Sequence, residues 1–157
     1  MNKQQQMQDI LKDTIDYYNE DPANRRSINK DGSCTYTWGD NHCAVGRYLK
    51  PEYQKENWSE NSMSVHELSE YSDDMSIDCF LVKKAHGLDL DFWTRLQDMH
   101  DIVGNWEEWH EHRDGVRKYG LTDRGKEEYV KFQDKIAEGV YDTFKQIIET
   151  TKQQERE

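Results

Sequence analysis

The side chains best suited to chemistry in this chain are gathered in one short segment, residues 31–49. It contains Cys34, Tyr36, His42 and Cys43, and it ends soon after Arg47. A thiol becomes a nucleophile when its pKa is lowered, and the N-terminus of a helix has that effect. If residues 43–49 form a short helix, Cys43 would stand at its start. This segment is therefore the first place to look for a site.

A cysteine-dependent enzyme is one hypothesis for this segment. It would pair Cys43 with a base, and His100 is the best candidate because Asp98 and Asp101 lie beside it in the sequence and could orient its ring. The segment carries no signature of a cysteine protease family. Catalysis is thus the alternative interpretation, and a protein without enzymatic activity is favoured.

A weaker hypothesis is a zinc site built from Cys34, Cys43 and Cys79, with a histidine such as His42 as a further ligand. Structural zinc ligands usually come in pairs about two to four residues apart, and this spacing is missing. Cysteine is also among the most buried residue types, so core thiols explain the same pattern. We therefore expect no metal and no cofactor.

Cationic residues surround the aromatic part of this segment. Arg26, His42 and Arg47 could form a local positive pocket, since guanidinium groups match carboxylate and phosphate. Tyr36 or Trp38 could then stack on a base. The competing interpretation is that these arginines pair with the many Asp and Glu side chains of the chain.

Composition limits what the protein can do. The chain has 157 residues, a net charge of −11 and few aliphatic residues, but it has five Trp and nine Tyr. We expect a single domain over 1–157 with an aromatic-rich core and a frayed tail near 151–157. The acidic excess argues against direct binding to nucleic acid or to an anionic membrane. An acidic mimic of nucleic acid is a further alternative, using the carboxylates of the last helix (Glu127, Glu128, Asp134 and Glu138).

The compartment can also be inferred. No apolar run approaches the roughly 20 residues that span a bilayer. No secretory leader precedes the three cysteines, whose odd number favours thiols over disulfides. We expect a reducing cytoplasm and no membrane association.

Periodicity predicts an α+β fold that is predominantly helical, with a short strand or hairpin near 33–38 packed on several amphipathic helices. The last helix has a wide apolar stripe that could also pair with a second copy of the chain. Residues 43–49 are ambiguous between helix and strand, with helix favoured. The helical segments expected are 4–20, a short one capped by Ser64, one from Asp89 or Asp91 to Gly104, and one from Thr122 to about 150.

Two blocks of the sequence resemble a group of small uncharacterised phage and prophage proteins. The first is a G-x-C-x-Y strand around Cys34, followed by C-A-V-G-R-x-L at 43–49. The second is an L-Q-x-x-H-D block at 96–101. The resemblance covers roughly residues 24–50 and 85–106. It implies a phage-type accessory protein that acts inside a bacterial host cell.

The resemblance further implies that the two blocks form one spatial unit. Taking this unit together with the cationic residues around the strand, we expect the ligand-binding residues to be Arg26, Tyr36, His42, Arg47, Gln97, His100 and Asp101. The expected function is to bind and sequester or inhibit a host component, either a defence protein or a nucleotide-type signal. The partner would then be a bacterial host protein or a small phosphorylated ligand.

Overall fold

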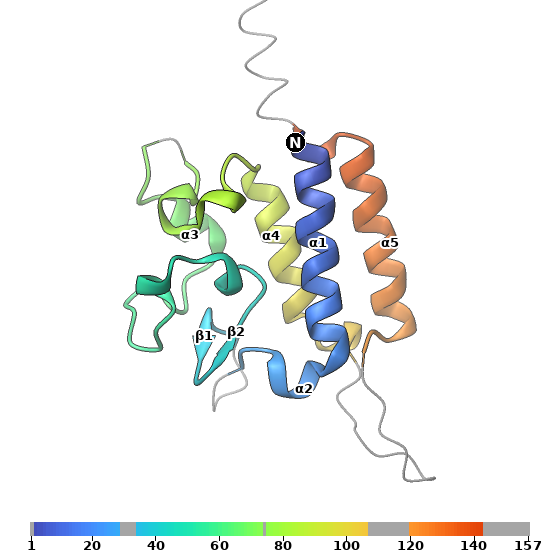
Figure 1. The fold of residues 1–157 in the computed structure, drawn as a ribbon, viewed down its shortest axis with the longest axis horizontal. Coiled ribbons are helices and arrows are strands. Elements are labelled where there is room, and N and C mark those ends of the chain that lie inside the picture. Colours follow the sequence, from blue (N-terminus) through green and yellow to red (C-terminus); the bar gives the residue numbers. More distant parts are fainter. Residues whose placement is uncertain (1, 29–33, 74, 107–119, 143–157) are drawn as a thin grey trace, which may run out of the picture.

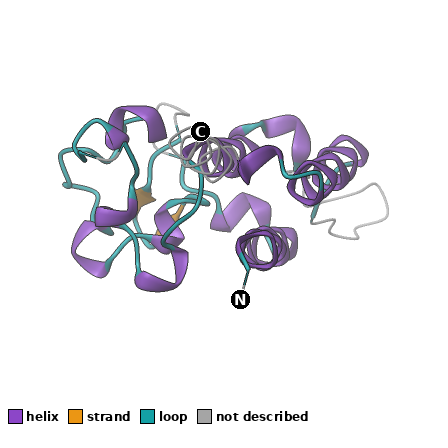
Figure 2. Ribbon diagram, turned by 90° about the horizontal axis from the view of Figure 1, so that it is seen from above, coloured by secondary structure: helices purple, strands orange, loops and turns teal. Residues whose placement is uncertain are grey.

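The computed structural model describes residues 2–28, 34–73, 75–106 and 120–142. Three longer helices lie side by side in one half of the molecule, and a small hairpin with short helical turns forms the other half (Figures 1 and 2). The helices are α1 (Lys3–Glu20), α2 (Pro22–Arg25), α3 (Val65–Ser69), α4 (Leu90–Asp101) and α5 (Asp123–Ala137), and the strands are β1 (Thr37–Trp38) and β2 (Asn41–His42).

Helix α1 begins and ends where local signals place it. The Asn2 side chain accepts a hydrogen bond from the backbone N–H of Gln5, which satisfies one of the free donors of the first turn. The helix ends before Pro22, because the residue preceding a proline avoids helical geometry. Its apolar stripe is buried, from Met7 to Tyr18. The predicted helix over 4–20 is therefore confirmed.

Helices α4 and α5 complete the helical layer. Asp89 caps α4 and Thr122 caps α5 through side-chain hydrogen bonds to the backbone, as predicted. Phe92 of α4 packs edge-to-face against Phe132 of α5, at 5.6 Å between ring centroids. Most of the apolar stripe of α5 within the described residues thus packs inside its own chain.

The last helix is shorter than predicted. It ends at Ala137, and the N–H of Gly139 bonds back to the carbonyl of Ile136. Gly139 has φ of 81°, a left-handed conformation that closes a helix and that side chains disfavour. Residues 143–150, the end of the predicted helix, lie outside the described residues.

The second half of the molecule is built from short elements. Strands β1 and β2 pair antiparallel, with Thr37 opposite His42. Cys34, predicted to lie in the strand, instead forms an isolated bridge with Ile28. Residues 43–49 contain one 3₁₀ turn, Gly46–Tyr48, rather than an α-helix. The hairpin and the five helices together confirm an α+β fold that is predominantly helical.

None of the helices in the described parts of the chain is long and apolar enough to cross a membrane.

Candidate functional site

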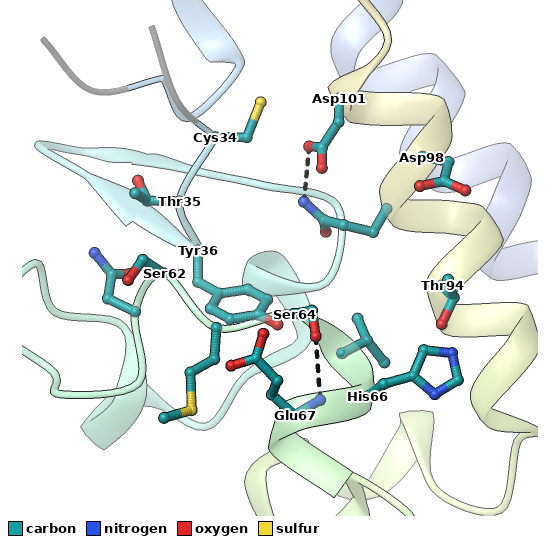
Figure 3. Close-up of a pocket in the computed structure, with 14 residues that line it drawn as sticks. Cys34, Thr35, Tyr36, Ser62, Ser64, His66, Glu67, Thr94, Asp98 and Asp101 are labelled. Carbon is teal, nitrogen blue, oxygen red and sulfur yellow. Dashed lines mark hydrogen bonds between the residues drawn. The ribbon is translucent and has the colours of Figure 1, made fainter. Parts of the chain in front are cut away.

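A cavity of about 270 Å³ lies between the Cys34–Tyr36 segment, the loop before α3, and the exposed side of α4 (Figure 3). It joins the two blocks that sequence analysis singled out, because Cys34 and Tyr36 come from the first, and Gln97 and Asp101 from the second. The other lining residues are Thr35, Asn61, Ser62, Met63, Ser64, Val65, His66, Glu67, Thr94 and Asp98.

The inner wall is formed by Tyr36. Its side chain is only 3% exposed, and its hydroxyl group is buried without a hydrogen-bond partner. Burial, with smaller contributions from nearby acidic groups, raises the pKa of Tyr36, so this phenol is neutral. Buried polar groups normally have partners, and this hydroxyl is one of a few in the described residues that lack one.

Asn61 fixes Tyr36 in this position. Its backbone carbonyl accepts from the N–H of Tyr36, and its side-chain amide exchanges hydrogen bonds with both backbone groups of Thr37. The loop before α3 thus pairs with the hairpin as a further strand would. Tyr36 and Thr37, although adjacent in the sequence, are therefore both buried.

The opposite wall comes from α4. Asp101 accepts hydrogen bonds on Oδ1 from Gln97 Nε2 at 2.9 Å and from His100 Nδ1 at 2.7 Å. The side-chain oxygen of Gln97, Oε1, accepts a hydrogen bond from the backbone N–H of Val45. Gln97 therefore links the cavity wall to the segment 43–49, so the two sequence blocks do form one packed unit.

His100 lies directly behind this wall and is fully buried. Its Nε2 accepts a hydrogen bond from the backbone N–H of Ser27, at 3.2 Å. A backbone amide can only donate, so Nε2 must be unprotonated and Nδ1 must carry the proton that goes to Asp101. Desolvation outweighs the attraction of Asp101 and lowers the pKa of His100.

This arrangement leaves His100 without a nitrogen lone pair for other chemistry. It cannot take a proton from a thiol unless the bond to Ser27 breaks. The same argument applies to a metal. Within the described residues, the only cluster with metal-ligand spacing is Cys34, His100 and Asp101, and there the imidazole has no free lone pair. We therefore derive no metal chemistry from this cluster.

Cys43 does not suit the role of a nucleophile. Its side chain is 0% exposed, and its sulfur accepts a hydrogen bond from the N–H of Gly46. Burial raises the pKa of this thiol, with smaller opposing effects from neighbouring N–H groups. The predicted effect of a helix N-terminus is absent because no α-helix begins there. The proposed zinc set is also not assembled: Cys79 is exposed and Cys43 is buried, and neither belongs to the metal-like cluster.

The predicted positive pocket is not formed. Arg26 is 2% exposed and donates to the backbone carbonyls of His100 and Asp101, so it closes the C-terminus of α4. Arg47 pairs with Asp13 at 3.1 Å and lies over the Tyr17 ring of α1 at 4.1 Å. Neither guanidinium lines the cavity, because each is used to join elements of the fold.

His42 also lies away from the cavity. Its Nδ1 is 3.0 Å from the Thr37 hydroxyl, and its backbone carbonyl accepts from the Tyr18 hydroxyl. Burial, followed by the positive charge of Arg47, lowers the pKa of His42. This histidine joins the hairpin to α1.

Two acidic residues of the cavity wall, Glu67 and Asp98, were not expected to bind a ligand, and Asp98 was expected only as a residue that could orient His100. Glu67 belongs to α3, whose first turn is capped by the Ser64 hydroxyl, as predicted. Asp98 lies one helical turn before Asp101 on α4; burial raises its pKa, with Arg95 acting in the opposite direction. The capping signal around Ser64 located Glu67 on a helix but gave no sign that it faces α4.

No known protein family, curated protein or solved structure matches this chain. The site therefore has to be interpreted from its own geometry.

Proposed function

We propose that this protein is a small phage-type accessory protein that binds and sequesters or inhibits a host component without catalysing a reaction. The observation that carries the proposal is Tyr36, which lines the cavity and whose buried hydroxyl has no hydrogen-bond partner within the described residues. A polar group left in this state costs stability, and a ligand that bonds to it removes the cost.

The chemistry of the walls favours binding over catalysis. Cys43 is sealed in the core, and both nitrogens of His100 are occupied. The cavity also disfavours a phosphorylated ligand. Glu67, Asp98 and Asp101 line it, and none of the lining residues in the described part of the chain is Lys or Arg. Of the two partner classes expected from the sequence, a host protein is the better match.

The acidic-mimic alternative receives less support from α5. Glu128 is paired with Arg95 of α4 at 2.6 Å, and Glu138 lies 3.6 Å from Lys135 on its own helix. Charges that are partly neutralised in this way do not form a regular row of free carboxylates. The cavity is the better candidate for the binding surface.

The proposal can be tested by capture from a bacterial lysate with a variant that fills the cavity. Ser62 is exposed and lines the cavity, so Ser62→Trp places an indole at its rim. Ser59→Trp is the matched control, since Ser59 lies in the same loop, is exposed and does not line the cavity. We expect the wild type and Ser59→Trp to retain the same host protein, identified by mass spectrometry, and Ser62→Trp to lose it. Equal capture by all three proteins, or capture by none, would contradict the proposal.

A further inference from the structure

The side chains that line the cavity indicate the charge of the chemical group that it binds. We infer that the cavity receives one cationic side chain, arginine or lysine, from a basic segment of the partner protein. This inference rests on the proposed function and adds the chemistry of the bound group. Carboxylates from two helices line the cavity, Glu67 from α3 and both Asp98 and Asp101 from α4 (Figure 3). None of them forms an ion pair with a Lys or Arg within the described part of the chain.

The Tyr36 hydroxyl is the second, independent observation. It is buried, it has no partner within the described residues, and Figure 3 shows Tyr36 beside the start of α3, where Ser64 and Glu67 lie. A phenol oxygen accepts hydrogen bonds, and every N–H of a guanidinium or ammonium group donates one. A cation in the cavity would therefore satisfy the hydroxyl and face carboxylates at the same time.

The carboxylate of Asp101 is already fixed in one orientation by hydrogen bonds. Two donors, Gln97 Nε2 and His100 Nδ1, both bond to Oδ1. No hydrogen bond within the described residues engages the second oxygen, Oδ2. A carboxylate that is fixed in this way loses little conformational freedom when a ligand binds.

A metal ion is a poorer occupant than an organic cation. Glu67 and Asp98 are not part of the only cluster with metal-ligand spacing in the described residues. The carboxylates are therefore too far apart to surround one ion. The cavity of about 270 Å³ also falls just below the ~300–1,000 Å³ typical of small-molecule sites, which suits a single long side chain.

The test is an NMR titration of the full-length protein with short peptides. The probes are a glycine pentapeptide with one central arginine, the lysine counterpart, a counterpart with the neutral isostere citrulline, and free spermidine. We expect the arginine or lysine peptide to shift the backbone amide signals of Tyr36 and Gln97, and the citrulline peptide to leave them unchanged.

Charge-removing variants sharpen the test. The double variant Glu67→Gln/Asp98→Asn should weaken binding of the cationic peptide by about tenfold or more. The matched control, Glu127→Gln/Asp134→Asn, removes the same charge from equally exposed positions of α5 and should change affinity by less than about twofold, because neither residue lines the cavity. Equal losses in both variants would show a general charge effect and overturn the inference.

Tyr36→Phe separates the hydroxyl from the carboxylates. We expect it to weaken binding of the cationic peptide by about fivefold while the protein stays at least as stable in urea, since a buried group without a partner is removed. Unchanged affinity would overturn the role of the hydroxyl.

The remaining outcomes separate the sources of the ligand and the two proposals. If spermidine binds as tightly as the peptides, the ligand is a free polyamine and the inference of a protein side chain is wrong. If no cation binds but Ser62→Trp still abolishes capture of a host protein, only this inference fails. If capture does not depend on Ser62, the proposed function fails.

Discussion

The hydrogen bonds of His100 set its protonation state. Nδ1 donates to Asp101, Nε2 accepts from the N–H of Ser27, and a second proton on Nε2 would point at another donor. This imidazole therefore acts as a neutral link between the loop after α2 and the end of α4. Its position beside Asp101 keeps a carboxylate at the cavity wall without making the histidine a base.

His100 should make stability depend on pH. Because burial lowers its pKa in the folded protein, the unfolded chain takes up a proton at higher pH than the folded one. Stability is then fully present above the unfolded pKa of about 6.5 and falls as pH decreases below it, by at most about 1.4 kcal/mol per pH unit for this group. His42, whose pKa is also lowered, contributes with the same sign. Urea unfolding at pH 7.5 and 5.5 measures the difference.

The protonated nitrogen of His100 gives an independent check of this prediction. Long-range ¹H–¹⁵N NMR should find the proton of His100 on Nδ1 at pH 7. The control variant His66→Gln, which replaces an exposed histidine, should leave the pH dependence of stability unchanged. A proton on Nε2 would contradict the assigned hydrogen bonds.

Gly46 is required by a close approach of two backbone segments. A Cβ atom at this position would lie 2.2 Å from the carbonyl oxygen of Tyr36, which also accepts from the N–H of Cys43. We expect Gly46→Ala to lower the free energy of unfolding by about 3 kcal/mol or more, since backbone atoms must move. Gly104→Ala is the control: its Cβ would meet only the flexible Arg124 side chain, so a change within about 0.5 kcal/mol is expected. Equal effects in urea denaturation would refute the explanation.

At the scale of elements, the end of α5 is set by one residue. Gly139 adopts φ of 81°, so Gly139→Ala should not lengthen the helix but should destabilise the protein by about 1–2 kcal/mol. Glu138→Ala, at an exposed neighbour with right-handed backbone, should stay within about 0.5 kcal/mol. Circular dichroism during urea unfolding measures both helicity and stability. A gain in helicity without loss of stability would favour the longer helix predicted from the apolar stripe.

The longer helices could be predicted because their signals are local. The apolar stripes of α1 and α4 and the caps at Asp89 and Thr122 fixed position and boundaries within a few residues. The length of α5 could not be predicted, because its apolar spacing continues beyond a glycine whose φ is not visible in sequence. The helix predicted for residues 43–49 is wrong for a related reason, because hydrogen bonds to residues outside the segment, Tyr36 and Gln97, hold its backbone.

The site was predictable only in part. Tyr36, Gln97 and Asp101 line one cavity, as the expectation that the two blocks form a unit requires. Arg26 and Arg47 were assigned to a ligand although they bond to a helix terminus and to Asp13. Sequence shows which charges exist but not which ones are already paired, and that pairing decides which remain for a ligand.

At the scale of the whole molecule, the three thiols lie at three depths. Cys79 is exposed, Cys34 is half-buried at the cavity, and Cys43 is in the core with a raised pKa. We expect a disulfide reagent at pH 8 to modify Cys79 first, Cys34 more slowly, and Cys43 only when the whole domain unfolds, because the thiolate is the reacting form. Peptide mapping by mass spectrometry assigns the order. Native-state labelling of Cys43 ahead of Cys34 would contradict the buried position.

Helix α1 packs against α5, where the Gln8 side chain donates to the backbone carbonyl of Gln133, and its Tyr18 contacts His100 of α4 (Figure 1). On the ribosome, α1 emerges long before either neighbour exists. A lone helix of this length is only marginally stable in water, so its buried face stays uncovered while most of the chain is being made. Synthesis of this protein thus exposes the apolar face of α1, Leu11 and Tyr18 included, to chaperones until the segments that cover it have left the exit tunnel.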